Sequence, residues 1–232
     1  MSKTVPLAAL LLAAAAAPAA AAERNFGING FDRIRVEGPF RVRLATGVAP
    51  FARATGSPQG LDTIKLEVQG RTLIVRPNSS SWGGYPGRAS GPVEVSVGTH
   101  ELIAASVNGS GTLAIDAVKG LGFDLSVQGA GSASIGTVAV DQLKVGIVGA
   151  GSATIAGNAP KLTALVRGIS SLDASALAAK DAVLGADGPS TIRASVSNSA
   201  KVDATGTSHV ELAGAPSCIV RSSGSATISG CK

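Results

Sequence analysis

Aromatic side chains are scarce in this sequence: its 232 residues include five Phe, one Trp and one Tyr. This scarcity argues against a β-sandwich core, because such cores are packed with large rings. Glycine is abundant instead, with 30 residues. Many glycines and few rings are typical of a solenoid, in which small aliphatic side chains fill a thin core between stacked turns.

Long apolar runs are also missing after the N-terminal segment, so we expect no integral membrane segment. The exception is residues 1–22, where Lys3 precedes an apolar stretch (residues 5–17) and a small-residue cleavage site (residues 20–22). This pattern is typical of a secretory signal peptide; a retained membrane anchor is the alternative. We therefore expect an exported protein of the periplasm or cell surface that begins at Glu23.

No strong excess of one charge sign is present. The formal net charge of +5 falls to +4 when Lys3 is removed with the signal peptide. An excess of this size is usual for a solvated surface and does not indicate a nucleic-acid-binding protein. We therefore expect no nucleic acid among the partners.

What the chain does contain is a repeat of about twenty residues between Ser106 and Leu165. Glycines recur at positions 109, 129 and 149 and again at 111, 131 and 151. The tetrad Gly-Ala-Gly-Ser at 129–132 returns unchanged at 149–152. A fixed period of this length indicates a repeat architecture.

Each repeat contains two short segments in which apolar and polar residues alternate, as in half-buried strands. Inward positions include Ile115, Ile135 and Ile155, whereas Thr154 faces outward. Such short units cannot bury an apolar face alone, so they must stack about 4.8 Å apart. We predict an all-β domain over residues 23–232: a parallel β-helix (residues 106–232) after a β-rich N-terminal part (residues 23–105). The helix-favouring segment 175–184 follows the repeat register and is expected to be a strand.

The N-terminal part contains two candidate features. Residues 64–75 predict a hairpin around Gln69-Gly70. Four arginines alternate with apolar residues, so we expect their guanidinium groups to share one solvent face and to be candidate partner contacts: Arg33, Arg35, Arg41 and Arg43. The alternative is that these charges protect a sheet edge against aggregation.

A Gly-, Ser- and Pro-rich stretch between Pro77 and Pro92 predicts a surface loop. It carries the only Trp and the only Tyr of the chain, Trp82 and Tyr85. Aromatic side chains on a loop can contact a glycan or protein partner. The alternative is that the rings fold back over an apolar patch.

Candidate catalytic and metal-binding groups are few. His100 and His209 lack metal-ligand spacing, and neither a G-x-S-x-G nucleophile motif nor a G-G-x-G-x-D calcium repeat occurs. Three carboxylates share a column of the predicted register together with Arg193: Asp173, Asp203 and Glu211. We interpret this column as solvated alternating charges. A polysaccharide-active β-helix enzyme is the alternative, because such enzymes group carboxylates on adjacent coils. No catalytic residue, metal or cofactor is expected.

Several motifs resemble a known family in their order along the chain. They are Phe-Asp-Arg-Ile-Arg-Val (31–36), Phe-Arg-Val-Arg-Leu (40–44), Thr-Leu-Ile-Val (72–75), the Gly-x-Gly-Ser repeats, Gly-Ala-Pro (214–216) and Ser-Ser-Gly-Ser (222–225). Over residues 27–230 the chain resembles the family "Putative auto-transporter adhesin, head GIN domain". Ala215 departs from the Asn expected in the closing motif, which affects a turn. The resemblance implies a right-handed β-helix at the bacterial envelope and supplies no catalytic residues.

The chain contains only two cysteines, Cys218 and Cys231. They flank the final coil, and in an oxidising compartment two cysteines are more often paired than free. We predict a disulfide that pins the last coil; two free thiols are the alternative. Together, these features predict a non-catalytic exported envelope protein that serves as an adhesin, a scaffold or a ligand-binding surface. The candidate partners are an envelope polysaccharide and another envelope protein.

Overall fold

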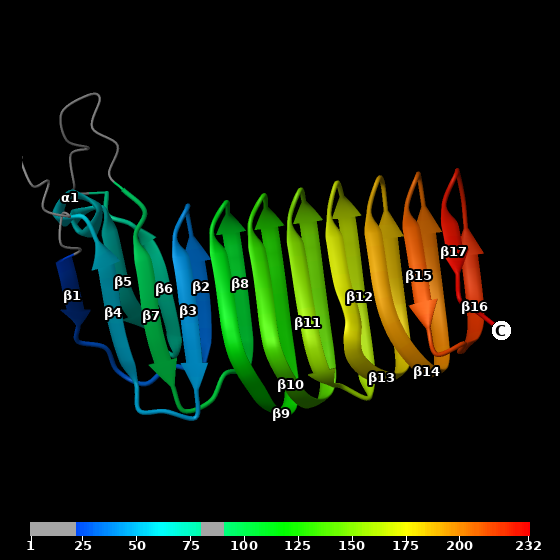
Figure 1. The fold of residues 1–232 in the computed structure, drawn as a ribbon, viewed down its shortest axis with the longest axis horizontal. Coiled ribbons are helices and arrows are strands. Elements are labelled where there is room, and N and C mark those ends of the chain that lie inside the picture. Colours follow the sequence, from blue (N-terminus) through cyan, green and yellow to red (C-terminus); the bar gives the residue numbers. More distant parts are fainter. Residues whose placement is uncertain (1–21, 80–90) are drawn as a thin grey trace, which may run out of the picture.

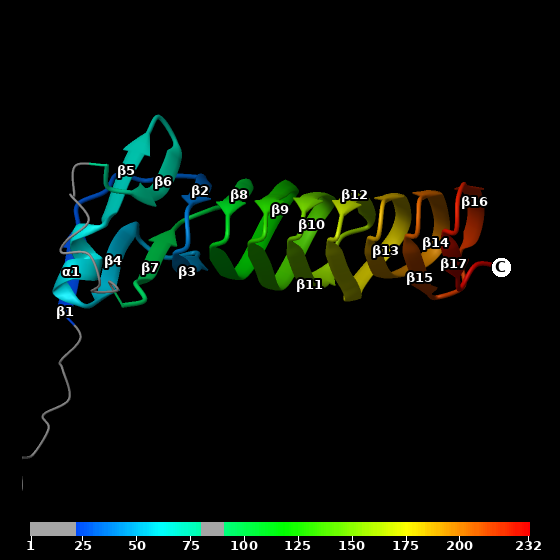
Figure 2. The same cartoon turned by 90° about the horizontal axis from the view of Figure 1, so that it is seen from above.

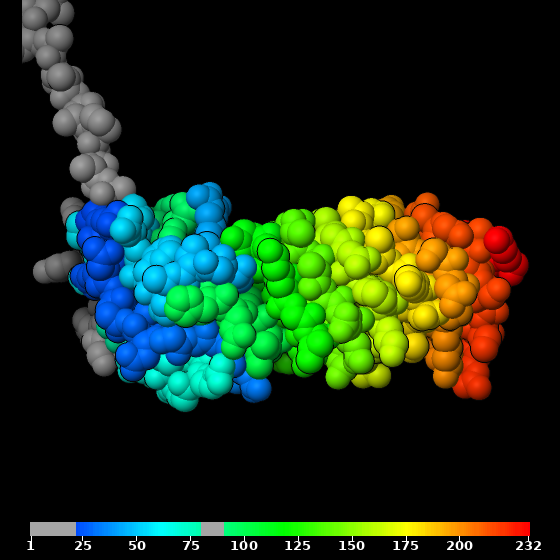
Figure 3. Space-filling view, turned by 90° about the horizontal axis from the view of Figure 1, so that it is seen from below, coloured from blue at the N-terminus to red at the C-terminus, as the bar shows by residue number. Residues whose placement is uncertain are grey.

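The computed structural model describes residues 22–79 and 91–232. Strands make up nearly all of the fold, which is a β-solenoid of about six turns. Over residues 104–232 the chain advances along the solenoid axis toward the C-terminal end (Figure 1), and the same order is visible as successive bands across the surface (Figure 3). In the N-terminal part, strands distant in sequence alternate along the axis. The predicted all-β solenoid with parallel coils is confirmed.

The N-terminal elements form the broader end of the molecule. They are β1 (Ala22–Phe26), β2 (Arg33–Glu37), β3 (Arg41–Thr46), β4 (Phe51–Gly56), α1 (Pro58–Asp62), β5 (Ile64–Gln69), β6 (Thr72–Pro77) and β7 (Glu94–Thr99). The predicted hairpin is confirmed, because β5 and β6 pair antiparallel from Ile64↔Pro77 to Gln69↔Thr72. The short helix α1 was not predicted; Ser57 caps it by accepting a hydrogen bond from the Gly60 N–H at 3.0 Å.

The remaining strands build the coils. They are β8 (Ala104–Gly109), β9 (Thr112–Gly129), β10 (Ser132–Gly149), β11 (Ser152–Asn158), β12 (Lys161–Gly168), β13 (Ser171–Asp187), β14 (Thr191–Thr205), β15 (His209–Ala213), β16 (Ser217–Ser222) and β17 (Thr227–Ser229). The strand β13 includes the helix-favouring segment 175–184, as the repeat register predicts. Parallel pairing on both sides overrides helix propensity there.

Two facing layers of strands make up the solenoid (Figure 2). The first sheet has the order β5-β6-β2-β8, continues through the C-terminal halves of β9 and β10, then β12 and the C-terminal halves of β13 and β14, and ends at β16. The second sheet runs β1-β4-β7-β3, through the N-terminal halves of β9 and β10, β11, and the N-terminal halves of β13 and β14, to β15 and β17. The long strands bend around one edge of the solenoid and therefore belong to both sheets.

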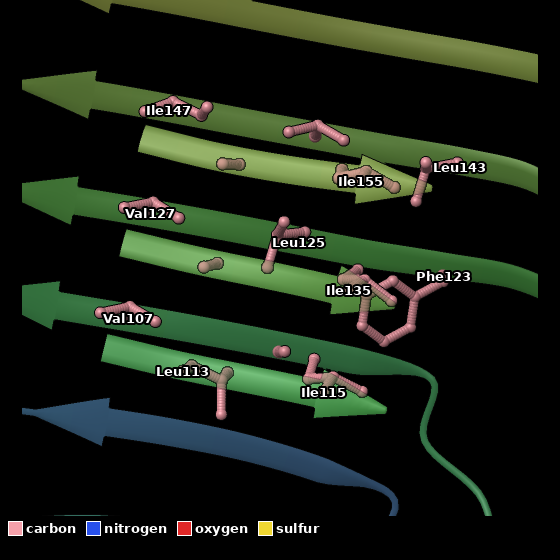
Figure 4. Close-up of a cluster of buried hydrophobic side chains, with 14 of the residues drawn as sticks. Val107, Leu113, Ile115, Phe123, Leu125, Val127, Ile135, Leu143, Ile147 and Ile155 are labelled. Atoms are coloured by element: carbon pink, nitrogen blue, oxygen red, sulfur yellow. The ribbon is translucent and has the colours of Figure 1, made fainter. Parts of the chain in front are cut away.

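The core is the narrow space between the two sheets. Side chains from both layers point into it, among them Val127 and Leu125 from one sheet and Ile135 and Ile155 from the other (Figure 4). The predicted register is confirmed, because Ile115, Ile135 and Ile155 lie side by side on successive strands. Each such aliphatic side chain contributes about 1.5–3 kcal/mol when it is fully buried.

The repeated glycines form one corner of every coil. Gly129 and Gly149 have φ angles of 99° and 115°, which side chains other than glycine rarely adopt. A Cβ atom at Gly149 would also lie 2.8 Å from the carbonyl oxygen of Gly129 in the preceding coil. The glycine period therefore reflects the close stacking of the corners.

Cys218 and Cys231 form a disulfide, with their Cα atoms 5.7 Å apart. This confirms the predicted pairing. Cys218 lies on β16 in the first sheet, and Cys231 follows β17 of the second sheet. The bond therefore joins the two sheets at the C-terminal end. Within residues 22–79 and 91–232, no helix has the length and apolarity needed to cross a membrane.

Candidate functional site

The outer surface of the first sheet is hollowed near its N-terminal end. A cavity of about 470 Å³ lies over β2, β8, β9, β10 and β12. Its floor is low because the outward side chains on consecutive strands are small: Ala104, Ser106, Ser126 and Gly146. Small residues in register across neighbouring coils therefore produce a depression without bending the sheet.

A second cavity of about 410 Å³ continues along the same sheet from β12 to β16. The two cavities share Thr163, so they form one elongated depression parallel to the solenoid axis, which we call the trough. A third hollow of about 290 Å³ widens the trough toward Gln142. The trough thus extends from β2 to β16.

The hairpin β5–β6 stands out from the same side of the solenoid at the N-terminal end (Figure 2), and Thr72 of β6 belongs to the trough lining. The turn of the hairpin is anchored by Arg71, whose Nη2 lies 2.7 Å from Asp32 Oδ2 and 3.4 Å from Glu101 Oε1. The carbonyl oxygen of Arg71 also accepts hydrogen bonds from the N–H groups of Asp32 and Arg33. The turn of the hairpin is therefore fixed to the start of β2, the strand that begins the trough.

Positive side chains outnumber carboxylates in the trough lining. The cations are Arg33, Arg35, Lys144, Lys161 and Lys201, and the carboxylates are Asp124 and Asp181. The two arginines have only distant ion-pair partners, since Arg33 Nε lies 4.0 Å from Asp32 and Arg35 Nη1 lies 3.9 Å from Glu37. None of the three lysines forms an ion pair within 4.0 Å of any residue that the structure describes. These charges are therefore available to a ligand.

Asp181 is already hydrogen-bonded within the protein. Its Oδ1 accepts hydrogen bonds from Ser199 Oγ at 2.5 Å and from Asn198 Nδ2 at 2.7 Å. The bond from Ser199, followed by the bond from Asn198, lowers the pKa of the Asp181 carboxyl below its ordinary value. Asp181 is thus a fixed carboxylate on the trough wall and is poorly suited to act as a general acid.

The structure separates the four predicted arginines into two pairs. Arg33 and Arg35 line the trough in the first sheet. Arg41 and Arg43 lie on β3 in the second sheet, where Arg43 Nη2 is 2.8 Å from Glu94 Oε1. The expectation that all four share one solvent face is therefore wrong. Gly38, with a φ of 93°, begins the turn that carries the chain from one sheet to the other.

The aromatic pair Trp82 and Tyr85 lies outside the described residues, so their role as partner contacts remains a sequence-based prediction.

The predicted carboxylate column is only partly correct. Asp173, Arg193 and Glu211 do lie side by side on successive strands of the second sheet, and Arg193 Nε is 3.2 Å from Glu211 Oε2. Asp203 is instead on the first sheet, between Gly185 and Arg221. The sequence pattern predicted its position wrongly, because alternation distinguishes inside from outside but does not identify the sheet.

Asp173 also lacks the environment of a catalytic acid. Hydrogen bonds from the Ser175 hydroxyl and N–H, at 2.6 and 3.1 Å, lower the pKa of the Asp173 carboxyl. A general acid in glycoside hydrolysis needs the opposite shift. The column is best described as one exposed ion pair, Arg193 with Glu211, beside a carboxylate that is hydrogen-bonded to Ser175. Within residues 22–79 and 91–232, no group of three or more His, Cys, Asp or Glu side chains is placed to hold a metal ion.

Sequence reasoning missed the trough and its three lysines. A partial signal was present, because Ser106, Ser126 and Gly146 occupy equivalent outward positions in successive repeats of twenty residues. The alignment of Arg33 with these coils could not be found in this way. It depends on the pairing of β2 with β8, some seventy residues later in the chain.

Comparisons with known proteins agree with this architecture. Residues 30–216 match the family described as "Putative auto-transporter adhesin, head GIN domain". No curated protein sequence matches the chain.

Several crystal structures share the fold. A protein from Bacteroides fragilis described as a "putative adhesin" has 17% identity and a TM-score of 0.80, with 90% of this chain and 95% of that chain covered. One from Parabacteroides distasonis described as a "putative lipid binding protein" has 18% identity and a TM-score of 0.71, covering 90% and 96%. A "putative adhesin" from Parabacteroides merdae has 14% identity and a TM-score of 0.66, covering 90% and 95%.

Neither the family description nor these three structures' descriptions name an enzyme. At these identities, the structural likeness shows the fold alone. The family match covers most of the chain and coincides with the motifs, the repeat and the two-sheet solenoid. The chain therefore belongs to the family described as "Putative auto-transporter adhesin, head GIN domain".

Proposed function

We propose that this protein is an exported, non-catalytic binding protein of the bacterial envelope and that the trough is its ligand-binding surface. The observation that carries the proposal is the combination of an elongated depression with cations that have no close ion-pair partner in the described part of the chain, Lys144 and Lys201 among them. Ligand sites are concave and present a few convergent polar groups, and an unpaired cation on such a surface attracts anionic partners.

An exported location is supported by the N-terminal segment and by the disulfide between Cys218 and Cys231. Disulfides persist in oxidising compartments such as the periplasm and the cell surface. The adhesin-type family suggests contact with envelope components. An envelope polysaccharide is the partner that an elongated trough lined by cations, hydroxyl groups and apolar side chains suits best, because such a polymer can follow the depression over several coils.

The absence of turnover is part of the proposal. Asp181 in the trough and Asp173 on the second sheet both have lowered pKa values. Neither is therefore tuned to donate a proton near neutral pH. The protein binds its partner and releases it unchanged.

The test uses purified protein, a panel of envelope polysaccharides and two matched double variants. Arg33→Gln/Arg35→Gln should weaken polysaccharide binding by about tenfold, as expected for the loss of about 1.4 kcal/mol. Arg41→Gln/Arg43→Gln removes the same charge from the second sheet and should leave the dissociation constant unchanged. Hydrolysis or lytic cleavage of any bound polymer would overturn the proposal, as would equal losses in the two double variants.

A further inference from the structure

Three cations of the trough lie on one straight line across the strands. The residue pairs along the first sheet run from Arg33 through Ala104 and Asp124 to Lys144, and then through Thr163 and Val183 to Lys201. Arg33, Lys144 and Lys201 are therefore each separated by three strand spacings. With neighbouring strands about 4.8 Å apart, the two intervals are about 14 Å each.

The side chains between Arg33 and Lys144 are polar or small, whereas Leu165 and Val183 present apolar surface between Lys144 and Lys201. Ser106, Ser126 and Gly146 lie beside the line on the neighbouring outward position, and Thr163 lies within it. Asp124 also lies within the line, next to Lys144, but forms no ion pair within 4.0 Å in the described part of the chain. A carboxylate accepts hydrogen bonds and repels anions. The lining thus suits a ligand that has hydroxyl groups between its negative charges.

We infer that the trough binds a straight, extended acidic polysaccharide whose chain lies parallel to the solenoid axis, with its carboxylates at Arg33, Lys144 and Lys201. This inference rests on the proposed function and specifies its ligand. Hydroxyl groups of the sugars meet Asp124, Ser126 and Thr163, while the low floor at Gly146 leaves space for the rings. A densely charged polymer without hydroxyl groups would place negative charge against Asp124.

The spacing of the cations has a measurable consequence. A short acidic oligosaccharide reaches one cation, whereas a chain that spans both intervals, about 29 Å, engages all three. Linked contacts strengthen binding because each later contact is intramolecular. Affinity therefore increases with chain length until both intervals are spanned and is then constant per binding site.

The experiment measures dissociation constants by calorimetry for hyaluronan oligomers of defined length, in which an uncharged amino sugar separates successive uronic acids. We expect an increase in affinity of about tenfold or more between oligomers that span one interval and those that span two. Methyl-esterified oligomers of equal length, which lack the negative charge, should bind at least about tenfold more weakly. Lys201→Gln should abolish the gain of the longest oligomers and leave the affinity for the short ones unchanged. The matched control is Lys119→Gln, an exposed lysine outside the trough lining, which should change neither.

Four outcomes would overturn the inference. Affinity that does not depend on length would exclude the axial orientation. Equal binding of the esterified oligomers would exclude the role of the cations. Equal binding of single-stranded DNA of the same length would exclude the polysaccharide class. Failure of all uronic acid oligomers, while envelope polysaccharides still bind through Arg33 and Arg35, would exclude the acidic ligand. None of these outcomes decides the proposed function, which is tested separately by the polysaccharide panel and the two double arginine variants.

Discussion

The two sheets of the solenoid share the same coils but differ on their outer surfaces. In both sheets the inward positions hold aliphatic side chains, because each coil must bury them against its neighbours. On the second sheet the outward charges pair with one another, as Arg43 does with Glu94 and Arg193 with Glu211. On the first sheet, Lys144 and the other trough lysines have no such partner among the residues that the structure describes. Stacking thus requires apolar residues at the inward positions of both sheets, but it does not constrain the residues at the outward positions, which differ between the sheets.

The largest effect is expected for a charge placed between the two sheets. Ile155 is fully buried, and its neighbour Thr154 faces outward on the second sheet. Ile155→Asp should lower the free energy of unfolding by about 3–5 kcal/mol, because an unpaired carboxylate would enter an apolar core. Thr154→Asp should change it by less than about 0.5 kcal/mol. Urea denaturation compares the two variants, and equal losses of stability would contradict the assigned register.

The next largest loss of stability is expected when the disulfide between Cys218 and Cys231 is removed. Cys218→Ala/Cys231→Ala should lower the free energy of unfolding by about 2–3 kcal/mol, since the open loop gains conformational entropy when unfolded. Amide hydrogen exchange should increase mainly in β16 and β17, because the final coil has a neighbour on only one side. Chemically reduced wild-type protein provides the control and should behave as the double variant does. Uniform loss of protection along the solenoid would contradict a local role.

A smaller loss of stability is expected for a change in the hairpin β5–β6, which belongs to the first sheet. Arg71→Ala removes the closer of the two ion-pair partners of Asp32, whose side chain is only 7% exposed. We expect a loss of about 1–2 kcal/mol, limited by the exposure of Arg71 to solvent. Arg43→Ala breaks an exposed ion pair on the second sheet and should cost less than about 1 kcal/mol. Thermal denaturation ranks the two variants, and a larger loss for Arg43→Ala would reverse the comparison.

The smallest effect is a dependence on pH. The folded protein lowers the pKa of Asp173 through Ser175 and that of Asp181 through Ser199. The stability that these carboxylates contribute is therefore complete above their unfolded pKa, about 3.9, and is lost as the pH falls through the lower folded value. Asp173→Asn and Asp181→Asn should each flatten the decrease in melting temperature below about pH 4 and leave its shape above pH 6 unchanged. An unaltered acid profile in both variants would contradict the assigned hydrogen bonds.

Most of the coil architecture follows from local sequence, because a repeat of twenty residues specifies its own neighbours. The inward position of Ile155, the strand at residues 175–184 and the disulfide of Cys218 could all be predicted on that basis. The assignment of residues to one sheet or the other could not. Arg41 and Asp203 were placed on the wrong sheet because alternation repeats on both sheets and does not show where the chain crosses the core.

The trough could not be predicted from local sequence for a related physical reason. Its N-terminal end is formed by the pairing of β2 with β8. The alignment of its cations depends on the register that joins Arg33 to Lys144 across strands distant in sequence. Neither residue is unusual in its own segment. Only the register of the assembled sheet shows that these cations are collinear.

The disulfide also determines how the molecule responds to mechanical load. The described chain starts at one end of the solenoid and finishes at the other (Figure 1), so tension applied between those ends pulls on the outermost strands first. At the C-terminal end the strands are parallel, and strands loaded in this way detach one after another. The bond between Cys218 and Cys231, 13 residues apart, carries the load directly into β16 and its pairing with β14. The segment between the two cysteines therefore adds no length when the protein is stretched, and unravelling from this end must begin with the detachment of β16.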